Sequence, residues 1–567
     1  MIWTKNQHDP KLKSLLEADG VSSIFAELIA GRDTGILSKS DIPGYAEADL
    51  GLLEDPTLIP NVETATDVVL EAAGKGRSAM IFGDYDADGV ISSYMMKRLL
   101  HGTGYERVDC FIPDRIAEGY GLNDISVANF LRQCSIEYDL VVALDCGSSS
   151  RKQIEMIKKI IPNTKVVVLD HHIVESGEFS DNADAVLNPR LGTATHFCTG
   201  GVVYQFARAV GSRIGIGADA LLPYAAITTV ADVCELKRGN RILVKNGLQA
   251  MEHCTDPGLR MIMEKASINP AQCTVRDIGF GIGPLINAAG RLKHASIALN
   301  ALQSLDIDTA KHMAASLAHI NEERKVLQNK TFEKALEKCK GRTGMSSALI
   351  YDEKWHTGVV GIVASKICEK FGVPTICFGR ANGKIKGSAR SIQGVHVKEI
   401  MDRCSELFSK HGGHEMAAGA TLKDDRLEDA WDVFDTEVAA YLKEKGVSLG
   451  HKAFYDTELT EGSIRRLDGH FCSMLESLGP FGNGNERPVF RANGLKCFGV
   501  SPWGSGTGAF FRFEKLSLDC YGRTGDADPM NMKGKHLDIL FDLERSFADK
   551  TKWAANIRHC RMSLSVG

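Results

Sequence analysis

Long hydrophobic runs are missing from the sequence. No apolar stretch approaches the roughly 20 residues that are needed to cross a bilayer. The opening residues, MIWTKNQHDP, also lack the basic stretch followed by an apolar stretch that is typical of a secretory signal. We therefore expect a cytoplasmic protein.

Paired cysteines and a surplus of positive charge are missing as well. The 15 cysteines are scattered, without a CxxC pair or the Cys/His spacing of a zinc site. This distribution argues against a disulfide framework and is typical of reduced, buried thiols. The net charge of -5 argues against a protein coated with phosphate-binding residues, but it leaves room for a local basic track or for a site that bound cations neutralise.

The chain also has no internal repeat and no low-complexity tract, so its 567 residues must form several ordinary globular domains. From about residue 61, short runs of Val, Ile and Leu alternate with helical stretches, as they do in parallel α/β sheets. We expect five parts: a lead-in (1–60), a catalytic α/β domain (61–300), a long connecting helix (301–340), a second α/β domain (341–445) and a small β-barrel (446–567).

Three aspartates gather where the first strand of the catalytic domain should end. The stretch IFGDYDADGV places Asp84, Asp86 and Asp88 at alternate positions after an apolar run. Residues two apart in an extended segment lie about 7 Å from each other on one face, so three ionised carboxylates would repel one another. Bound cations between them would remove this repulsion.

Two further apolar runs end in the same way. YDLVVALDCG leads to Asp145, and TKVVVLDHH leads to Asp170, His171 and His172. Ligands of open α/β sheets bind outside the carboxyl ends of the strands, so these residues should meet Asp84 in one crevice.

Another acid, Asp232 in AAITTVADVCEL, follows a predicted helix rather than a strand, so the pattern alone does not bring it to that crevice. Carboxylates and imidazole without clustered cysteine favour Mg²⁺ or Mn²⁺ over structural zinc. DADG by itself is more often a turn or part of a Ca²⁺ loop, and paired histidines are often structural. The three acidic strand ends together favour a catalytic metal site.

These motifs resemble a known superfamily. In order, GDYDADGV, LDCG, LDHH and TVADV resemble the four signatures of the DHH phosphoesterases, and HGGHEMAAG resembles the glycine-rich signature of their accessory domain. Further segments resemble the bacterial exonucleases of that superfamily that degrade single-stranded DNA from the 5′ end, over about residues 65–545: PDRIAEGYGL, INAAGRL, NEERK, WHTGVVGIVASK, KGSARS and LGPFGNGNERPVF.

The resemblance implies six ligands for two divalent cations, Mn²⁺ or Mg²⁺: Asp84, Asp86, Asp88, Asp145, His171 and Asp232. Asp84, Asp86 and Asp232 would hold one ion. Asp88 and His171 would hold the other, together with Asp232 or Asp145. Asp145 is the expected bridge between the ions.

It also implies residues that contact the substrate. His172 would contact the scissile phosphate, unless it only packs beside His171. Arg115, Arg291 and Arg390 correspond to arginines that grip phosphate oxygens with parallel hydrogen bonds. In each case the alternative is an ordinary surface arginine.

Ser388 would form the pocket for the terminal 5′-phosphate together with Arg390, while Gly412, Gly413 and His414 would face the metal site from the second domain. Trp355 and His356 are weaker candidates for the lining of the groove, because a tryptophan at a strand end usually belongs to the core.

The implied reaction is hydrolysis that releases 5′-mononucleotides from single-stranded DNA, as part of DNA repair and recombination. The 5′-phosphate pocket would set the direction, and a passage too narrow for duplex would select single strands. The barrel resembles an OB-fold, which binds single strands by aromatic stacking and a positive groove. Candidate contacts there, some of which alternation assigns to the core, are Trp503, Phe510, Phe511, Arg512 and Lys515.

Three positions depart from the pattern of the relatives. Asp114 stands where Asn is common, Ala389 where Gly is frequent, and Glu415 where a small residue is usual. None of these changes removes a predicted metal ligand, although each could alter the substrate pocket.

The sequence leaves two other functions open. One is a DHH-family hydrolase of short RNA, cyclic dinucleotides or pyrophosphate, against which the additional C-terminal residues argue. The other is a replication scaffold without catalysis, against which the complete set of acids argues. We expect a monomer that acts with a helicase and a single-strand-binding protein.

Overall fold

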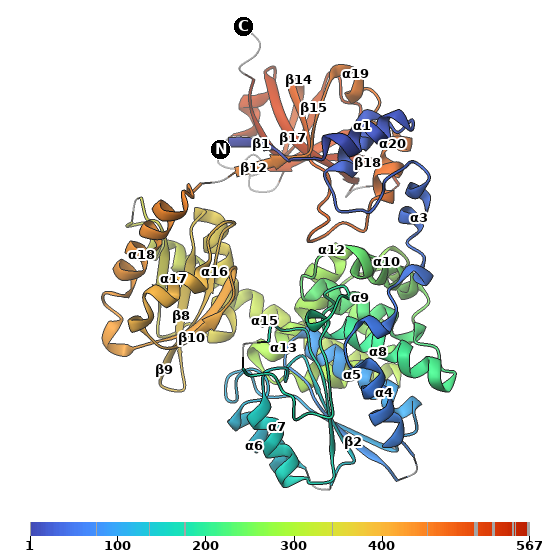
Figure 1. The fold of residues 1–567 in the computed structure, drawn as a ribbon. Helices are drawn as coiled ribbons and strands as arrows, with labels where there is room; N and C mark the ends of the chain where they lie inside the picture. Colours follow the sequence, from blue (N-terminus) through green and yellow to red (C-terminus); the bar gives the residue numbers. More distant parts are fainter. Residues whose placement is uncertain are drawn as a thin grey trace. The chain divides into compact units, whose positions relative to one another are not determined.

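The computed structural model describes residues 2–74, 76–134, 137–174, 177–342, 344–450, 452–503, 508–523, 528–546, 549 and 551–563 (Figure 1). The chain divides into two compact units. One comprises Met1–Leu53, Val233–Asn246 and Lys452–Gly567, and the other comprises Glu54–Asp232 and Gly247–His451. Among the described residues, no helix combines the length and the hydropathy that a membrane crossing needs.

A parallel sheet forms the centre of the catalytic α/β domain. Its strands lie in the order β3-β2-β4-β5-β6, and every neighbouring pair is parallel. The strands are β2 (Ser78–Phe82), β3 (Arg107–Phe111), β4 (Leu140–Leu144), β5 (Lys165–Leu169) and β6 (Ala185–Leu187). All residues of β2 and β4 are buried, which explains why they read as continuous apolar runs.

Helices cover both faces of this sheet, as alternation along the strands requires. Met80 and Phe82 point to the face covered by α6 (Asp124–Gln133) and α7 (Arg151–Ile160), which lie side by side (Figure 1). The helices α4 (Val62–Glu71), α5 (Ala87–Gly102), α8 (Thr199–Ile214) and α9 (Leu222–Ala231) pack with one another, and α5 and α8 also contact strands of the sheet. The parallel α/β sheet predicted from the sequence is confirmed, and the structure adds that helices cover both of its faces.

A helical segment follows and leads to the second α/β domain. The π-helical turn Ile278–Ile282 continues directly into α13 (Gly283–Leu292), which packs against the 33-residue helix α15 (Ile307–Cys339). The remaining helices of this segment are α10 (Arg238–Glu252), α11 (Pro257–Lys265), α12 (Val275–Asp277) and α14 (Ser296–Gln303). The predicted connecting helix is thus present as α15.

The second α/β domain contains a mixed sheet in the order β10-β11-β9-β8-β7. Only β7 and β8 are parallel. Its strands are β7 (Ala348–Tyr351), β8 (Thr375–Ala381), β9 (Lys384–Arg390), β10 (Phe408–Gly413) and β11 (Ala417–Leu422). Helix α16 (Thr357–Phe371) and the end of α15 cover one face, while α17 (Val397–Arg403) and α18 (Ala430–Lys445) cover the other.

The C-terminal strands close into the predicted barrel. β14 pairs with both β15 and β17, and the order β14-β15-β16-β18-β17 returns to β14, so five strands close an OB-like barrel. Their bounds are β14 (Phe490–Trp503), β15 (Gly508–Phe513), β16 (Asp519–Arg523), β17 (His536–Arg545) and β18 (Trp553–Met562). The short strand β13 (Thr457–Leu459) adds to the start of β14 in parallel.

The beginning of the chain packs with this barrel. β1 (Ile2–Lys5) pairs with β12 (Lys452–Tyr455) in parallel. Leu16 of α1 (Pro10–Ala18) and Phe25 of α2 (Ser23–Ala30) share a core with strands of the barrel. This unit also contains α3 (Asp41–Glu47), α19 (Glu461–Ile464), α20 (Gly469–Ser477) and the first part of α10.

Candidate metal centre and phosphate-binding site

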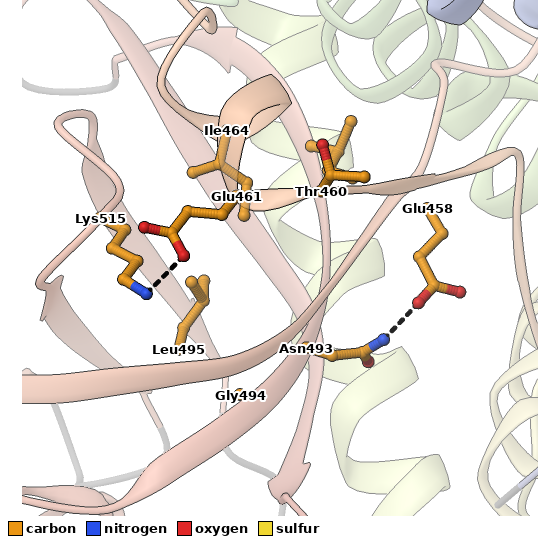
Figure 2. Close-up of a pocket in the computed structure, with 9 residues that line it drawn as sticks. Glu458, Thr460, Glu461, Ile464, Asn493, Gly494, Leu495 and Lys515 are labelled. Atoms are coloured by element: carbon orange, nitrogen blue, oxygen red, sulfur yellow. Dashed lines mark hydrogen bonds and ion pairs between the residues drawn. The ribbon is translucent and has the colours of Figure 1, made fainter. Parts of the chain in front are cut away.

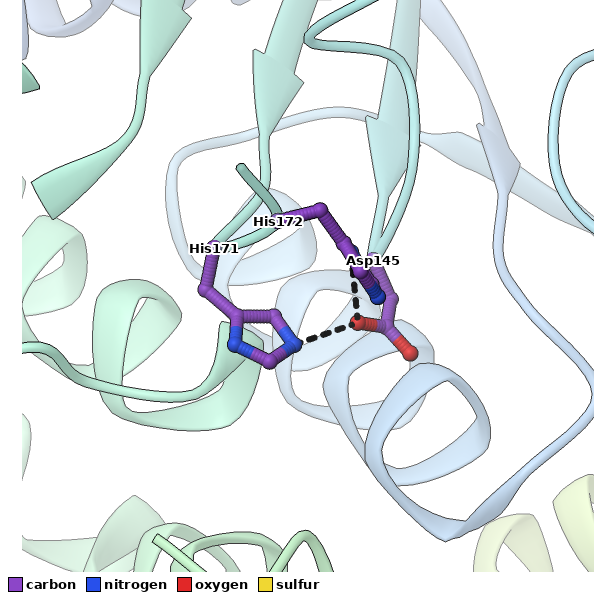
Figure 3. Close-up of side chains that lie close together, drawn as sticks. All are labelled: Asp145, His171 and His172. Atoms are coloured by element: carbon purple, nitrogen blue, oxygen red, sulfur yellow. Dashed lines mark ion pairs between the residues drawn. The ribbon is translucent and has the colours of Figure 1, made fainter. Parts of the chain in front are cut away.

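The acids that follow β2, β4 and β5 converge at one edge of the parallel sheet. Among the described residues, three groups have potential ligand atoms within 4.8 Å of one another: Asp84, Asp86 and Asp145; Asp88, His171 and Asp232; and Asp145, His171 and His172. Figure 3 shows the third group, in which both imidazoles approach the same carboxylate. The structure therefore brings together all six side chains that the sequence singles out as ligands, plus His172.

The grouping differs in one respect from the division that the resemblance implies. Asp232, at the C-terminus of α9, lies with Asp88 and His171 instead of with Asp84 and Asp86. Asp145 and His171 each belong to two of the groups. The predicted bridging role of Asp145 stays a prediction.

Two helix N-termini hold the carboxylates of the DADG segment. Asp86 caps α5 and accepts hydrogen bonds from the backbone N–H groups of Asp88 and Gly89 at 3.0 and 3.1 Å. Asp88 in turn accepts from the N–H groups of Thr199 and Gly200, at 2.8 and 2.9 Å, where α8 begins. Backbone donors at a helix start stabilise a carboxylate and fix its orientation.

This second contact, which lies in the segment CTGG, was not predicted from the sequence. A Cβ atom at Gly200 would lie 2.2 Å from the side-chain oxygen of Thr228, so the close approach of α8 and α9 requires glycine there. The Thr199 hydroxyl also donates to Oδ1 of Asp145 at 3.0 Å. The available signal was a Thr-Gly-Gly run just before an apolar helical pattern.

Asp145 adopts a strained backbone conformation. Its φ angle of 63° lies in the left-handed region, which aspartate visits less readily than glycine. The conformation turns the chain sharply after β4 and presents the carboxylate to His171, whose Nε2 lies 3.3 Å from Oδ1.

Asp170 orients His172 and is itself absent from the three ligand groups found among the described residues. Its Oδ1 lies 2.8 Å from Nδ1 of His172, and its Oδ2 accepts from the N–H of Ser148 at 3.0 Å. Burial opposes a charge on the imidazole, but this hydrogen bond and the charge of Asp170 outweigh it and raise the pKa of His172 to about 9. Tyr120, which the prediction did not single out, places its hydroxyl 3.0 Å from Nδ1 of His172 and donates to the carbonyl of Asp145 at 2.9 Å.

The electrostatics of the cluster fit divalent cations. Burial, followed by the charges of neighbouring aspartates, raises the pKa of Asp84 and Asp145 well above the usual range and that of Asp88 to about 6. Burial lowers the pKa of His171 to about 4, which leaves a neutral imidazole with a lone pair for a ligand. The buried Oδ1 of Asp84 has no hydrogen-bond partner among the described residues. Repelling carboxylates with an unused oxygen are the donor set of an Mn²⁺ or Mg²⁺ site.

Helix α13 fits closely against the DADG segment. The side-chain oxygen of Asn287 accepts the N–H of Ala87 at 3.0 Å. A Cβ atom at Gly290 would lie only 2.3 Å from the carbonyl oxygen of Tyr85. The motif INAAGRL therefore holds α13 against the DADG segment. It also places Arg291, near the end of α13, beside this segment.

The predicted phosphate-binding arginines gather beside the cluster. Arg115 lies over the ring of Tyr85 with its guanidinium carbon 4.8 Å from the centroid, and Nη1 of Arg291 donates to the carbonyl of Gly358 at 3.3 Å. Burial and then the charges of Arg115, Arg324 and Arg390 lower the pKa of Arg291 to about 9. This mutual repulsion marks a place where an anion would be favoured.

Ser388 and Arg390 lie on β9 and face the start of α16. A Cβ atom at Gly361 would lie 3.2 Å from Nη2 of Arg390 and 3.3 Å from Oγ of Ser388, so a glycine on α16 leaves room for both. His356 caps α16, because its Nδ1 accepts the N–H of Gly358 at 3.1 Å, while Trp355 is buried in the core.

The position of the glycine-rich hairpin of the second domain gives less support to its predicted role. Gly412 and Gly413 end β10, and His414 follows in the turn to β11, where its N–H donates to the carbonyl of Ala417 at 2.8 Å. All three are exposed, and His414 belongs to none of the ligand groups found among the described residues. Their predicted approach to the metal site remains a proposal.

Of the three departures from the family pattern, only that at Asp114 has a local explanation among the described residues. The side chain of Asp114 accepts the N–H groups of Ile116 and Ala117 at 2.8 and 2.7 Å and so closes the loop that carries Arg115. Ala389 is fully buried within β9, and the carbonyl of Glu415 accepts the N–H of Val397 at 2.9 Å.

The barrel exposes part of the predicted aromatic set. Trp503, Phe510 and Tyr521 contact one another through their rings, and Phe510 is 50% exposed. Phe511, the next residue, is buried in the core. Arg512 and Lys515 are exposed.

Lys515 also belongs to a separate hollow of about 410 Å³ in the same unit (Figure 2). There the ammonium group of Lys515 forms an ion pair with Glu461 at 2.8 Å. Asn493 and Glu458 form a second polar contact in the wall of this hollow.

Comparisons with known proteins agree with this geometry. Residues 78–231 match the DHH family, N-terminal domain, and residues 343–440 match the DHHA1 domain. The single-stranded-DNA-specific exonuclease RecJ of Haemophilus influenzae is 32% identical over 462 residues, which cover 77% of this chain and 78% of that protein. RecJ of Bacillus subtilis is 31% identical, with 96% of this chain and 68% of that protein covered. The crystal structure of RecJ with Mn²⁺ from Thermus thermophilus matches with a TM-score of 0.82 at 23% identity. The match covers 100% of this chain and 80% of the Thermus thermophilus chain.

The paired domains and the cluster of aspartates and histidines define a phosphoesterase of the DHH type. Within that class, the chain belongs to the RecJ family.

Proposed function

We propose that this protein is a metal-dependent exonuclease that degrades single-stranded DNA from the 5′ end and releases 5′-mononucleotides. The main support is the convergence of six candidate ligands on one edge of the sheet, beside a group of arginines without ion-pair partners among the described residues. The names of its relatives, which are single-stranded-DNA-specific exonucleases, support the substrate.

In this proposal Asp84, Asp86 and Asp145 hold one cation, and Asp88, His171 and Asp232 hold the other. Two Mn²⁺ or Mg²⁺ ions, when bound, supply an activated water and offset charge on the phosphoryl oxygens.

The chain itself contributes orientation and charge around the phosphate. His172, held by Asp170, donates a hydrogen bond to a phosphoryl oxygen, and Arg291 contacts the same phosphate from α13. Thr199 and Gly200 keep the ligand carboxylates in place through hydrogen bonds of 3.0 and 2.9 Å.

The direction of degradation follows from the end of the strand that the site accepts. Arg115, Ser388 and Arg390 form the pocket for a terminal 5′-phosphate, and Gly412, Gly413 and His414 approach it from the second domain. A guanidinium with adjacent hydroxyl and backbone groups suits a dianionic terminal phosphate. Trp503 and Phe510 of the barrel bind the strand farther from its end by stacking.

The domains divide this work. We propose that residues 61–300 carry catalysis, 301–340 connect, 341–445 bind the 5′ end, 446–567 bind the single strand, and the 1–60 segment supports the barrel. We further propose a cytoplasmic monomer. Because the substrate is single-stranded, a helicase would have to unwind duplex DNA first, and a single-strand-binding protein would then hold the strand.

The test uses single strands that differ only in the labelled end and the 5′ group. With Mn²⁺ or Mg²⁺ present, we expect a 5′-label to appear at once as a mononucleotide and a 3′-label to shorten gradually. Asp145→Ala should abolish both, while Asp181→Asn, an exposed surface change, should not. Cleavage of dinucleotides or pyrophosphate without degradation of long strands would establish the alternative hydrolase, and wild-type inactivity on every substrate would establish the scaffold.

A further inference from the structure

Helix α15 carries an arginine with an unusual environment. Arg324 lies half-buried in the segment NEERK, and its Nε donates to Oδ1 of Asn321 at 3.0 Å. Its Nη1 donates to Oε1 of Gln328 at 2.8 Å. Asn321 and Gln328 are only 6% and 7% exposed, so two buried amides one turn away on either side fix the guanidinium.

Both hydrogen-bond partners of Arg324 are neutral amides, so they do not balance the positive charge of its guanidinium. Among the described residues, no salt bridge involves Arg324, Arg115, Arg291 or Arg390. Burial lowers the pKa of Arg324, and Glu322 opposes this change from the exposed side of the helix. A fixed, partly desolvated cation without a carboxylate partner favours a bound anion.

Arg324 also acts on the phosphate-binding group already described. α15 packs against both α13, which carries Arg291, and α16, which faces Arg390. The charge of Arg324 is one of the three guanidinium charges that lower the pKa of Arg291. The packing and the shared repulsion place Arg324 in the same positive region.

We propose that Arg324 binds an internucleotide phosphate of the single strand, beyond the phosphates that Arg115, Arg291 and Arg390 hold. This inference rests on the proposed function. The two hydrogen bonds of Arg324 use Nε and Nη1 and leave Nη2 available. A planar guanidinium whose other nitrogens are fixed can direct that N–H at a phosphate oxygen without losing further side-chain freedom. The long helix is then part of the substrate channel as well as a connector.

The experiment combines protein and DNA changes. A series of 5′-phosphorylated single strands carries one neutral methylphosphonate linkage each, at successive positions from the 5′ end. KM and kcat are measured for the wild type, Arg324→Gln, Arg324→Lys and Lys330→Gln, which removes an exposed charge from the same helix.

We expect Arg324→Gln to raise KM on the unmodified strand by about tenfold or more, as loss of a charged hydrogen bond does, with a smaller change in kcat. One neutral linkage should raise KM for the wild type but no longer for Arg324→Gln. The salt dependence of binding should weaken by about one counterion. Arg324→Lys should be intermediate, and Lys330→Gln should match the wild type.

A merely structural arginine gives another pattern. If Arg324→Gln keeps the wild-type penalty at every neutral linkage, the inference is overturned even though the enzyme degrades single strands. If the wild type degrades none of the strands, the proposed function fails, and this inference fails with it. Circular dichroism of each variant shows whether it is folded. If Arg324→Gln is not folded, the response of Arg324→Lys to the neutral linkages decides the question.

Discussion

The Nδ1 atom of His172 lies 2.8 Å from Oδ1 of Asp170, and the same oxygen accepts the backbone N–H groups of His171 and His172 at 2.8 and 3.2 Å. One buried carboxylate thus fixes both the backbone and the imidazole of the paired histidines. Asp170 therefore acts as a positioning residue, although the family takes its name from it.

Asp170→Asn should test that role, because it keeps the shape of the side chain and removes its charge. We expect activity on single-stranded DNA to fall roughly 10- to 100-fold, the usual effect of losing the partner of a functional histidine. Steady-state kinetics beside Asp181→Asn would measure it. Wild-type rates in Asp170→Asn would contradict the assignment.

The repulsion in the acid cluster predicts that Asp145→Asn raises the stability of the protein without metal and lowers the stability that metal adds. Asp145→Asn should increase the free energy of unfolding in EDTA, because it removes a buried like charge. The wild type should gain about 2.7 kcal/mol when Mn²⁺ is present at 100 times its Kd, and Asp145→Asn should lose most of this gain. Thermal unfolding in EDTA and in Mn²⁺ measures both effects. An unchanged response to Mn²⁺ would remove Asp145 from the ligands.

The contact between α13 and the DADG segment should tolerate no side chain at Gly290. Gly290→Ala would place a methyl group 2.3 Å from the Tyr85 carbonyl and should cost about 1–3 kcal/mol of stability, with a loss of kcat because Arg291 shifts. Gly102→Ala is the control, since its nearest neighbour would lie 3.9 Å away. Denaturant unfolding and kinetics of both variants provide the comparison. Equal stability of the two variants would refute the close contact.

The aromatic surface of the barrel should contribute to the binding of long strands. Phe510→Ala should weaken binding of a long single strand by about 1–3 kcal/mol, as loss of one stacking platform does, and should leave a very short strand unaffected. Phe498→Ala, which removes another ring that is 51% exposed, is the matched control. Fluorescence anisotropy gives the affinities. The same loss in both variants would point to a general effect of the surface.

The N-terminal segment should make the barrel unit sensitive to acid through Glu27. This buried carboxylate pairs with Lys5 at 2.5 Å and accepts the hydroxyl of Thr457 at 2.8 Å. Burial acts to raise the pKa of Glu27, but these partners outweigh it and lower the pKa from 4.5.

A lowered pKa means that the stabilisation is complete above pH 4.5 and disappears as the pH falls through the value in the folded protein. Glu27→Gln should therefore be less stable than the wild type near pH 7, and the difference should shrink under acid. Urea unfolding at several pH values measures it. A difference independent of pH would exclude the charge of Glu27 as its cause.

Much of the catalytic domain could be predicted, because its signals are local. Buried parallel strands read as apolar runs, and their carboxyl ends meet at one edge, so the acids after β2, β4 and β5 could be placed together from the sequence alone. Asp232 could not be placed in this way, since it ends a helix, and only the packing of α9 brings it to Asp88.

Other parts of the site depend on contacts between distant segments. Thr199 holds Asp88 across 111 positions, and Asn287 holds Ala87 across 200. Such hydrogen bonds leave no periodic trace in the sequence. In the barrel, alternation indicated that some aromatic residues belong to the core, but only the strand register exposed Phe510 and buried Phe511.

The sequence by itself determined the types of element, the order of the domains and the chemistry of the ligands, because hydrophobic period and side-chain type are properties of the chain. The tertiary structure decided which carboxylates share a group, which helix starts support them and where Arg324 lies. Those relationships arise only when α8 and α13 pack on α5, and α15 packs on α13. No local pattern encodes the distances that this packing creates.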